Sequence, residues 1–225
     1  MIACVVTIAK EPVAGQVKTR IASTLGAETA RELYRCSLTD TVDLLRALDG
    51  VQPALSFAPD TLDARAYFAA LAPGFTLVAQ RGADLGERLL NTFVSLNALG
   101  FAPIVLIGSD NPSVPRNYIE QALALLDQPA TDAVLGPASD GGYYLLGMCA
   151  PLAPLFRDIR WSSEIVAQQT RDRAAERALC LQEVPEWYDL DTAEDLRELY
   201  REVSESGERR APHTCDFLRS HGLTG

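Results

Sequence analysis

Residues 2–20 read IACVVTIAKEPVAGQVKTR and combine a strand with a loop that is rich in cations. The first part is a continuous, β-branched apolar run, which is typical of a central strand in a parallel sheet. The loop that follows contains Lys10, Lys18 and Arg20 together with a proline and a glycine. Ligands bind beyond the carboxyl ends of the strands in sheets of this kind. The stretch therefore predicts the start of an α/β sheet and one wall of a ligand site.

Short apolar strands alternate with amphipathic helices along the rest of the chain. Apolar spacing predicts strands at residues 2–9, 53–58, 75–79, 103–108, 133–136, 143–148 and 178–184. It predicts helices at residues 27–48, 61–71, 85–99, 115–126, 162–175 and 192–203. This alternation indicates an α/β domain with a mostly parallel sheet and helices on both faces. Because the chain turns polar after residue 203, we expect a domain over residues 1–203 and a C-terminal extension over residues 204–225.

The composition is that of a globular protein with an acidic surface. Of the 225 residues, 48% are hydrophobic, and 20 basic against 30 acidic side chains give a formal charge of −10. Such a surface repels phosphate polymers, so we expect no nucleic-acid partner. No apolar stretch approaches the ~18 residues that span a bilayer, and the N-terminal run lacks the flanks of a signal peptide. Five widely spaced cysteines argue against a disulfide framework, and we expect a cytoplasmic protein that does not bind membranes.

The loop after the first strand is the first candidate site. Backbone N–H groups and fixed positive charges in a glycine-containing loop can surround phosphate groups. Its spacing is neither that of a P-loop nor GxGxxG, and a solvated surface loop is the alternative interpretation. The residues that this loop offers to a nucleotide are Lys10, Gly15, Lys18, Thr19 and Arg20.

Carboxylates and glycines follow two later strands. Asp110 comes directly after the strand at 103–108, where a carboxylate is a natural ligand for Mg²⁺ or Mn²⁺ beside phosphates. The alternative is that Asp110 caps the adjacent proline turn. Asp84 is placed to cap the helix at 85–99. Gly86 lies in the first turn of that helix, where glycine lowers the stability of the helix. A ligand that approaches the backbone closely would explain why a glycine stands there.

Two more loops combine acidic residues with turn signals. Asp140, Gly141 and Gly142 lie between two apolar strands, where a hairpin turn is the simplest interpretation. Asp189 and Asp191 are two residues apart in an extended segment and therefore point to the same side. Asp191 also stands at a helix start, so capping is its alternative role. Together, the loops at this sheet edge predict a metal-dependent site for a nucleoside diphosphate or triphosphate.

Six motifs follow one another in an order that resembles a known family. They are AKEPVAGQVKTR, QRGADLGERL, IGSDNPSV, GPASDGGYYLLG, WSSEIV and YDLDTAEDL. From about Ile2 to Leu199, the sequence resembles a bacterial group in the GT-A nucleotide-diphospho-sugar transferase superfamily. That group is often catalogued as a domain of unknown function, and it includes arsenosugar-biosynthesis glycosyltransferase-like proteins. More distantly, the sequence is similar to molybdenum-cofactor and phospholactate guanylyltransferases.

The resemblance implies a single GT-A, Rossmann-like domain and a role for each motif. It implies that the first loop faces phosphate and that Asp110 binds the divalent ion, with Asp191 as a second metal-side carboxylate. The residues that it places at base and ribose are Gln80, Asp84, Gly86 and Arg88, and those beside the acceptor or sugar are Asp140, Gly141 and Gly142. Glycosyltransferases of this fold commonly carry Asp-x-Asp, whereas residues 109–112 here are SDNP. A second metal ligand must then come from Asp140, Asp191 or water.

Three functions remain open at this stage. The first, which we favour, is transfer of a glycosyl group from a nucleotide diphospho-sugar to a small acceptor, with Mg²⁺ or Mn²⁺ at the leaving diphosphate. Asp140 would then accept the proton of the acceptor. The second is nucleotidyl transfer from an NTP to a phosphorylated molecule with release of pyrophosphate, with Lys18 and Arg20 neutralising the triphosphate. The third is a non-catalytic nucleotide-binding protein.

Overall fold

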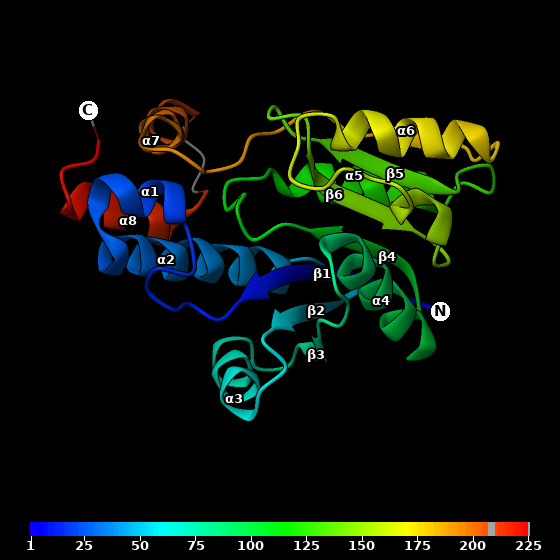
Figure 1. The fold of residues 1–225 in the computed structure, drawn as a ribbon, viewed down its shortest axis with the longest axis horizontal. Coiled ribbons are helices and arrows are strands. Elements are labelled where there is room, and N and C mark those ends of the chain that lie inside the picture. Colours follow the sequence, from blue (N-terminus) through cyan, green and yellow to red (C-terminus); the bar gives the residue numbers. More distant parts are fainter. Residues whose placement is uncertain (207–209, 225) are drawn as a thin grey trace.

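A mixed sheet forms the centre of the computed structural model, which describes residues 1–206 and 210–224 (Figure 1). Within these residues, seven strands run in the order β3-β2-β1-β4-β6-β5-β7. Their bounds are β1 Ile2–Lys10, β2 Val51–Ala58, β3 Thr76–Ala79, β4 Phe101–Ile107, β5 Ala133–Pro137, β6 Tyr143–Met148 and β7 Leu181–Glu183. Only β6 runs antiparallel to its neighbours among these strands. The prediction of a mostly parallel sheet is therefore confirmed.

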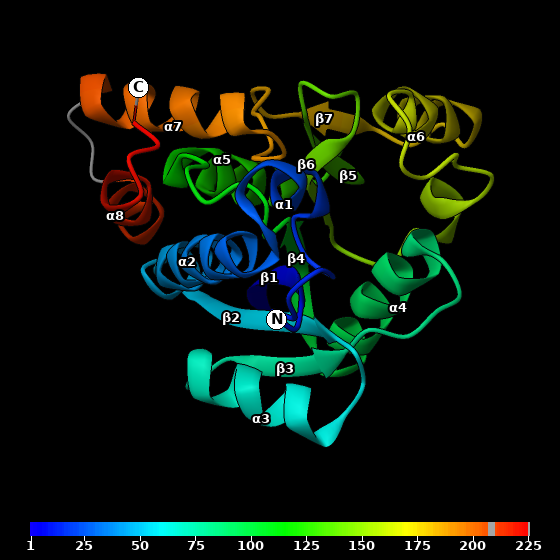
Figure 2. The same ribbon diagram turned by 60° about the vertical axis from the view of Figure 1, so that its left-hand side comes forward.

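Helices cover both faces of the sheet because side chains alternate along each strand. The described helices are α1 Thr19–Leu25, α2 Ala27–Arg46, α3 Leu62–Leu71, α4 Leu85–Ala98, α5 Arg116–Leu126, η1 Ala153–Phe156, α6 Val166–Glu176, α7 Ala193–Ser206 and α8 Pro212–Ser220. Cys4 and Val6 of β1 face one core with α4, η1 and α6. Val5 faces the opposite core with α2 and α5, and α3 extends that face beneath β2 and β3 (Figure 2). No helix in residues 1–206 and 210–224 combines the length and hydropathy that a membrane span needs.

The largest differences from the predicted elements lie where backbone geometry, not apolar spacing, decides the structure. Residues 19–25 form the short helix α1, although their sequence reads as part of a loop. The helix predicted to start at residue 162 starts at Val166, because the preceding residues form a connection in which Trp161 lies against Gly86 and Glu164 against Gly141. The strand predicted over 178–184 is limited to β7. These three segments have too few periodic apolar residues to predict their bounds.

The C-terminal helix α8 is fastened to α2 by one buried carboxylate. Asp40 accepts hydrogen bonds from the backbone N–H groups of His213 (2.9 Å) and Thr214 (2.8 Å) and from the Thr214 hydroxyl (2.7 Å). Leu218 of α8 is buried with residues of α1, α2 and α7, and Figure 2 shows α7 and α8 side by side near α2. The division of the chain at residue 203 stays a prediction, and residues 207–209 and 225 of the predicted extension lie outside the described residues.

Replacing this carboxylate is expected to detach α8. Asp40→Ala leaves the first N–H groups of α8 without their acceptor in a buried position, and we expect a loss of about 2 to 4 kcal/mol in the free energy of unfolding. Urea denaturation measures the loss. Asp43→Ala is the matched control, because Asp43 lies on the same helix and its carboxylate makes only exposed contacts, with Arg46 and with the His213 ring of α8. A loss as large in the control would show that the cap is not the cause.

Candidate functional site

A cleft of about 470 Å³ opens beyond the carboxyl ends of β1 and β4. The chain leaves β1 toward β2 on one side, and β4 returns on the other, so the cleft lies at the topological switch point of the sheet. Its lining includes eight of the residues predicted from the sequence, namely Lys10, Lys18, Thr19, Arg20, Gln80, Arg88, Asp110 and Asp191. Tyr34, Ser109 and Ser162 also line it and were not predicted. Distant loops therefore meet at one place, as predicted from their positions after strands.

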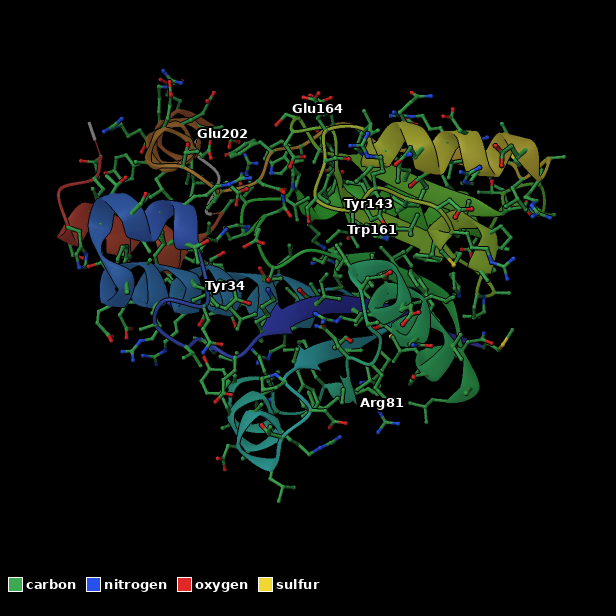
Figure 3. All side chains as sticks on the ribbon, viewed as in Figure 1. Tyr34, Arg81, Tyr143, Trp161, Glu164 and Glu202 are labelled. Carbon is green, nitrogen blue, oxygen red and sulfur yellow. The ribbon has the colours of Figure 1, made fainter. Side chains whose placement is uncertain are left out.

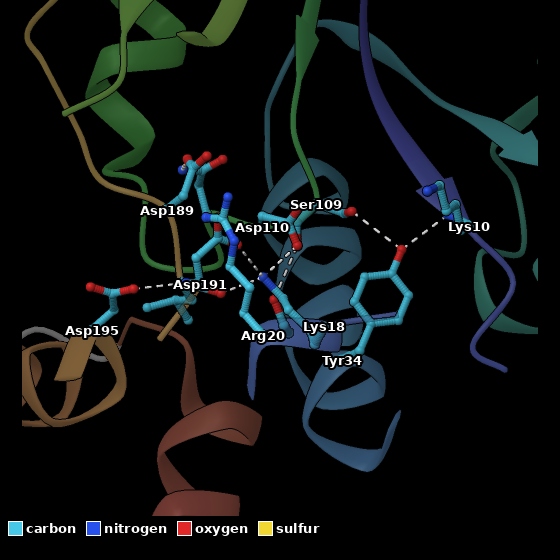
Figure 4. Close-up of polar contacts among 12 residues, drawn as sticks. Lys10, Lys18, Arg20, Tyr34, Ser109, Asp110, Asp189, Asp191 and Asp195 are labelled. Atoms are coloured by element: carbon cyan, nitrogen blue, oxygen red, sulfur yellow. Dashed lines mark hydrogen bonds and ion pairs between the residues drawn. The ribbon is translucent and has the colours of Figure 1, made fainter. Parts of the chain in front are cut away.

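Lys18 is the centre of the polar contacts in this cleft (Figure 4). Its Nζ lies 2.5 Å from Asp110 Oδ1, 2.5 Å from the carbonyl oxygen of Leu190 and 3.8 Å from Asp191 Oδ1. The Lys18 side chain is only 4% exposed, whereas that of Asp110 is 47% exposed. The backbone of Lys18 is left-handed, with φ of 47°, and it stands at the N-cap of α1. This sharp turn accounts for the break between the loop and α1 that the sequence did not reveal.

Asp191 faces the cleft, and Thr192 and Asp195 form a reciprocal cap at the start of α7. Asp195 accepts hydrogen bonds from the backbone N–H groups of Asp191 (2.8 Å) and Thr192 (2.6 Å), and Thr192 accepts one from Asp195. The Asp191 carboxylate instead pairs with Arg20 Nη1 at 3.0 Å. The capping role considered for Asp191 is therefore wrong. The turn-capping role of Asp110 likewise finds no support, since its carboxylate pairs with Lys18.

Tyr34 connects the first strand with the segment that carries Asp110. Its Oη accepts a hydrogen bond from the backbone N–H of Lys10 at 3.0 Å and lies 3.3 Å from Ser109 Oγ. Burial, together with the charge of Asp110, raises the pKa of the Tyr34 hydroxyl, so it stays neutral. In the sequence, Tyr34 is one of a series of apolar-face residues in a helix, and only the tertiary contacts distinguish it.

Asp189 lies near three other carboxylates, those of Asp110, Asp140 and Asp191. It accepts a hydrogen bond from Asn111 Nδ2, which also donates to the carbonyl oxygen of Tyr188 at 2.7 Å. Burial raises the pKa of Asp189 to about 6, and the charges of Asp110, Asp140 and Asp191 act in the same direction against the effect of Asn111. Asp140 is thus within electrostatic range of the cluster, although it does not line the cleft.

The raised pKa of Asp189 predicts a specific pH dependence of stability. The folded state holds this proton more tightly than the unfolded chain, so the free energy of unfolding falls as pH rises from 3.8 to about 6. Asp189→Asn removes this penalty, and we expect a gain of about 1 to 3 kcal/mol at pH 8 that disappears near pH 4. Urea unfolding at both pH values measures it. The exposed Asp216→Asn is the control, and an equal gain there would contradict the assignment.

Asp140, Gly141 and Gly142 form the turn between β5 and β6, so the hairpin interpretation is confirmed. Gly141 N donates to the carbonyl oxygen of Ala138 at 3.0 Å, and Asp140 Oδ1 accepts from Gly142 N at 2.8 Å. Gly141 has φ of +86°, and a Cβ there would lie 1.9 Å from the carbonyl oxygen of Glu164. The turn is therefore pressed against the 161–165 connection, and its place beside an acceptor stays a prediction.

The same connection explains Gly86. A Cβ on Gly86 would lie 2.6 Å from Trp161 Nε1, so the close neighbour is an indole ring. Trp161 also contacts the ring of Tyr143 edge-on, with centroids 6.4 Å apart, and Figure 3 shows the two side chains together. The explanation that a ligand approaches Gly86 is thus replaced by a contact within the protein, and a role of Gly86 in nucleotide binding stays a prediction.

Hydrogen bonds hold two further residues of the 80–88 segment, Asp84 and Gln80. Asp84 Oδ1 accepts from Glu87 N at 2.8 Å, and Glu87 accepts in return from Ala83 N, which confirms that Asp84 caps α4. Gln80 Nε2 donates to the carbonyl oxygens of Ser56 (2.8 Å) and Ala9. Gln80 is thereby fixed across the ends of β1 and β2 at the cleft.

The donor atoms around Lys18 Nζ suit a hard divalent cation. Two carboxylate oxygens and one backbone carbonyl oxygen converge there, and Mg²⁺ and Mn²⁺ prefer oxygen ligands. Among the described residues, no group of three or more His, Cys, Asp or Glu side chains is arranged to hold a metal. The predicted pair of Asp110 and Asp191 therefore needs a further ligand, and metal binding stays a prediction.

Comparisons with known proteins identify the fold. A nucleotide-diphospho-sugar transferase, so described provisionally, from Desulfovibrio desulfuricans G20 is 34% identical, with 99% of this chain and 96% of that chain covered and a TM-score of 0.90. The inositol-1-phosphate CTP transferase of T. maritima is 14% identical (92% and 97% covered, TM-score 0.58). A cytidylyltransferase of Leptospira borgpetersenii is 12% identical (99% and 95% covered, TM-score 0.56). The search of curated proteins gave no significant match.

These likenesses and the cleft at the switch point define an α/β protein of the nucleotidyltransferase and GT-A fold, as the sequence motifs implied. A model of the family described as "Uncharacterized protein conserved in bacteria (DUF2064)" matches residues 41–163, more than half of the chain. The chain belongs to the DUF2064 family.

Proposed function

We propose that this protein is a metal-dependent transferase that glycosylates a small acceptor from a nucleotide diphospho-sugar. The observation that carries the proposal is the meeting of Lys18, Asp110 and Asp191 at the switch point, where the oxygens of both carboxylates face the Lys18 ammonium. A departing diphosphate requires this combination. The 34% identical protein from Desulfovibrio desulfuricans G20, with its provisional description as a nucleotide-diphospho-sugar transferase, supports it.

The proposal assigns a task to each wall of the cleft. The first loop holds the diphosphate with Lys10, Gly15, Lys18, Thr19 and Arg20. The second wall holds base and ribose with Gln80, Asp84, Gly86 and Arg88. Asp110 and Asp191 hold Mg²⁺ or Mn²⁺, which would stabilise the charge on the leaving diphosphate. The turn of Asp140, Gly141 and Gly142 faces the acceptor, and Asp140 takes its proton.

The charge distribution favours glycosyl transfer over the second candidate. Burial raises the pKa values of the Asp189 and Asp191 carboxyls, and the nearby charges of Asp110 and Asp140 act in the same direction. Lys18 and Arg20 offset the charges of Asp110 and Asp191, so the negative field on this side of the cleft comes from Asp140 and Asp189, which accept hydrogen bonds from neutral groups. A phosphorylated acceptor, which nucleotidyl transfer requires, would be repelled by this field. A neutral sugar, alcohol or amine would not.

Nucleotidyl transfer from an NTP to a phosphorylated small molecule is the second candidate. The observation that favours it is the cationic first loop, whose charge suits a triphosphate. The fold is shared with cytidylyltransferases, which is compatible with this chemistry. A non-catalytic nucleotide-binding protein is the third candidate, but it has no need for a charged cluster whose burial raises the pKa of Asp189 and Asp191.

Thermal unfolding with a panel of ligands tests the proposal. Each NTP and each common nucleotide sugar is added with Mg²⁺ or Mn²⁺, and again with a chelator. At about 100 times the dissociation constant, a bound donor should raise the Tm by about 5 to 10 °C. The proposal expects stabilisation by an intact UDP- or GDP-sugar that the chelator weakens. Pyrophosphate release from an NTP without any sugar donor would instead establish the second candidate.

A further inference from the structure

The Lys18 ammonium occupies the position to which the metal-type oxygens point. Asp110 Oδ1 and the Leu190 carbonyl oxygen are both 2.5 Å from Nζ, and Asp191 Oδ1 is 3.8 Å away (Figure 4). The Leu190 carbonyl adds a third oxygen donor to the two carboxylates, and all three face the same atom. Lys18 therefore holds the place that a divalent cation would take among these oxygens.

A second cation cannot share this position with Lys18. Two positive charges about 4 Å apart repel by several kcal/mol at the effective dielectric near a protein surface. The Lys18 side chain is 4% exposed, so water screens that repulsion poorly. A metal that takes these oxygens must therefore displace the ammonium, and the displaced ammonium needs a new anionic partner.

The anion that can receive Lys18 is the phosphate of the nucleotide. The loop that ends in Lys18 lines the same cleft as Asp110, Gln80 and Arg88, so a diphosphate in the cleft lies within reach of this side chain. Arg20, the other cation beside Asp191, does not occupy this position. It pairs with Asp191 at 3.0 Å but is 74% exposed, and it does not contact Asp110 or Leu190 in the described contacts.

We infer that Lys18 is an internal substitute for the divalent cation, held by Asp110, the Leu190 carbonyl and Asp191, and that the metal displaces it weakly by itself but tightly once nucleotide phosphate accepts the ammonium. This inference rests on the proposed function for the identity of that phosphate. Metal and nucleotide then bind with positive coupling, and the metal alone binds weakly. The carbonyl of Leu190 becomes the third metal ligand beside the two carboxylates.

A titration with Mn²⁺ alone, followed by the electron paramagnetic resonance of the free ion, tests the exchange. Lys18→Met keeps the apolar stem and removes the charge, and we expect it to bind Mn²⁺ at least about tenfold more tightly than the native protein. Arg20→Met is the matched control, because it removes one positive charge beside the same Asp191 without vacating the position. We expect a change within about threefold for this control. Equal gains in both variants, or none for Lys18→Met, would overturn the inference.

Lysine labelling of the native protein provides a second measurement that needs no variant. The chain contains two lysines, the exposed Lys10 and the buried Lys18, so Lys10 is an internal reference. Mass spectrometry after brief acetylation should show Lys18 protected. Saturating Mn²⁺ should raise its labelling relative to Lys10 at least about tenfold, and added nucleoside diphosphate should restore protection. If the labelling of Lys18 relative to Lys10 does not change when Mn²⁺ binds, the inference is overturned.

The two proposals fail in different ways. The Mn²⁺ titration and the labelling with Mn²⁺ use no sugar donor, so they decide the exchange by themselves. A failure of every nucleotide sugar to stabilise the native protein would overturn the proposed function. Tight binding of Mn²⁺ to the native protein without nucleotide, with Lys18 still protected, would overturn the exchange and leave the proposed function in place.

Discussion

Asp110→Asn should lower glycosyl transfer by about 10³-fold or more while the protein stays folded. Asp110 lies three residues beyond the end of β4, and its carboxylate is both a proposed metal ligand and a close partner of Lys18. The amide is a poorer ligand for a hard cation and does not neutralise the ammonium. Product formation measured by mass spectrometry at saturating donor, with Tm as a check on folding, gives the result.

Asp189→Asn is the matched control for this experiment. It removes the same charge from the same carboxylate cluster, but Asp189 is turned toward Asn111 and is not a proposed ligand. We expect its activity to stay within about tenfold of the native value, since only the long-range field changes. Equal losses in the two variants would show that the net charge of the cluster matters and that Asp110 has no special position.

Gly141→Ala is expected to lower the free energy of unfolding by about 4 kcal/mol or more. Its Cβ would lie 1.9 Å from the carbonyl oxygen of Glu164, and the φ of +86° adds strain to any other residue. The hydrogen bond from Ala167 N to Gly141 O, at 2.9 Å, would be lost as the two segments separate. Urea denaturation measures the change.

Gly15→Ala separates the two causes of this loss. Gly15 has a similar φ of +77°, but a Cβ there has no neighbour within 4 Å. We expect it to lose only about 1 to 2 kcal/mol, the cost of the left-handed conformation. A comparable loss in both variants would mean that the contact with Glu164 is not rigid. That outcome would also indicate that the 161–165 connection can move away from the turn.

Several parts of the site were predictable because they depend on the sheet alone. The carboxyl ends of parallel strands lie at one edge, so Lys10, Gln80 and Asp110 had to converge once the strands were found. The cap at Asp84 was also predictable, because a helix start depends on a few consecutive residues. The structural reason for a glycine at position 86 was not predictable. Its close neighbour, Trp161, is far away in the sequence, and no local pattern indicates which ring will pack against a glycine.

The amino-acid sequence by itself determined the α/β class and the edge at which the site lies, because hydrophobic periodicity and strand-end chemistry are local properties. The tertiary structure alone decided what each polar group does there. Lys18 meets the carbonyl of Leu190 across 172 residues, and Asp40 caps α8 across 174. Asp191 pairs with Arg20 across 171 residues, while Thr192 and Asp195 cap the following helix. The partner of each of these charged groups is far away in the sequence. It is therefore determined by the long-range contacts of the folded chain and not by a local sequence pattern.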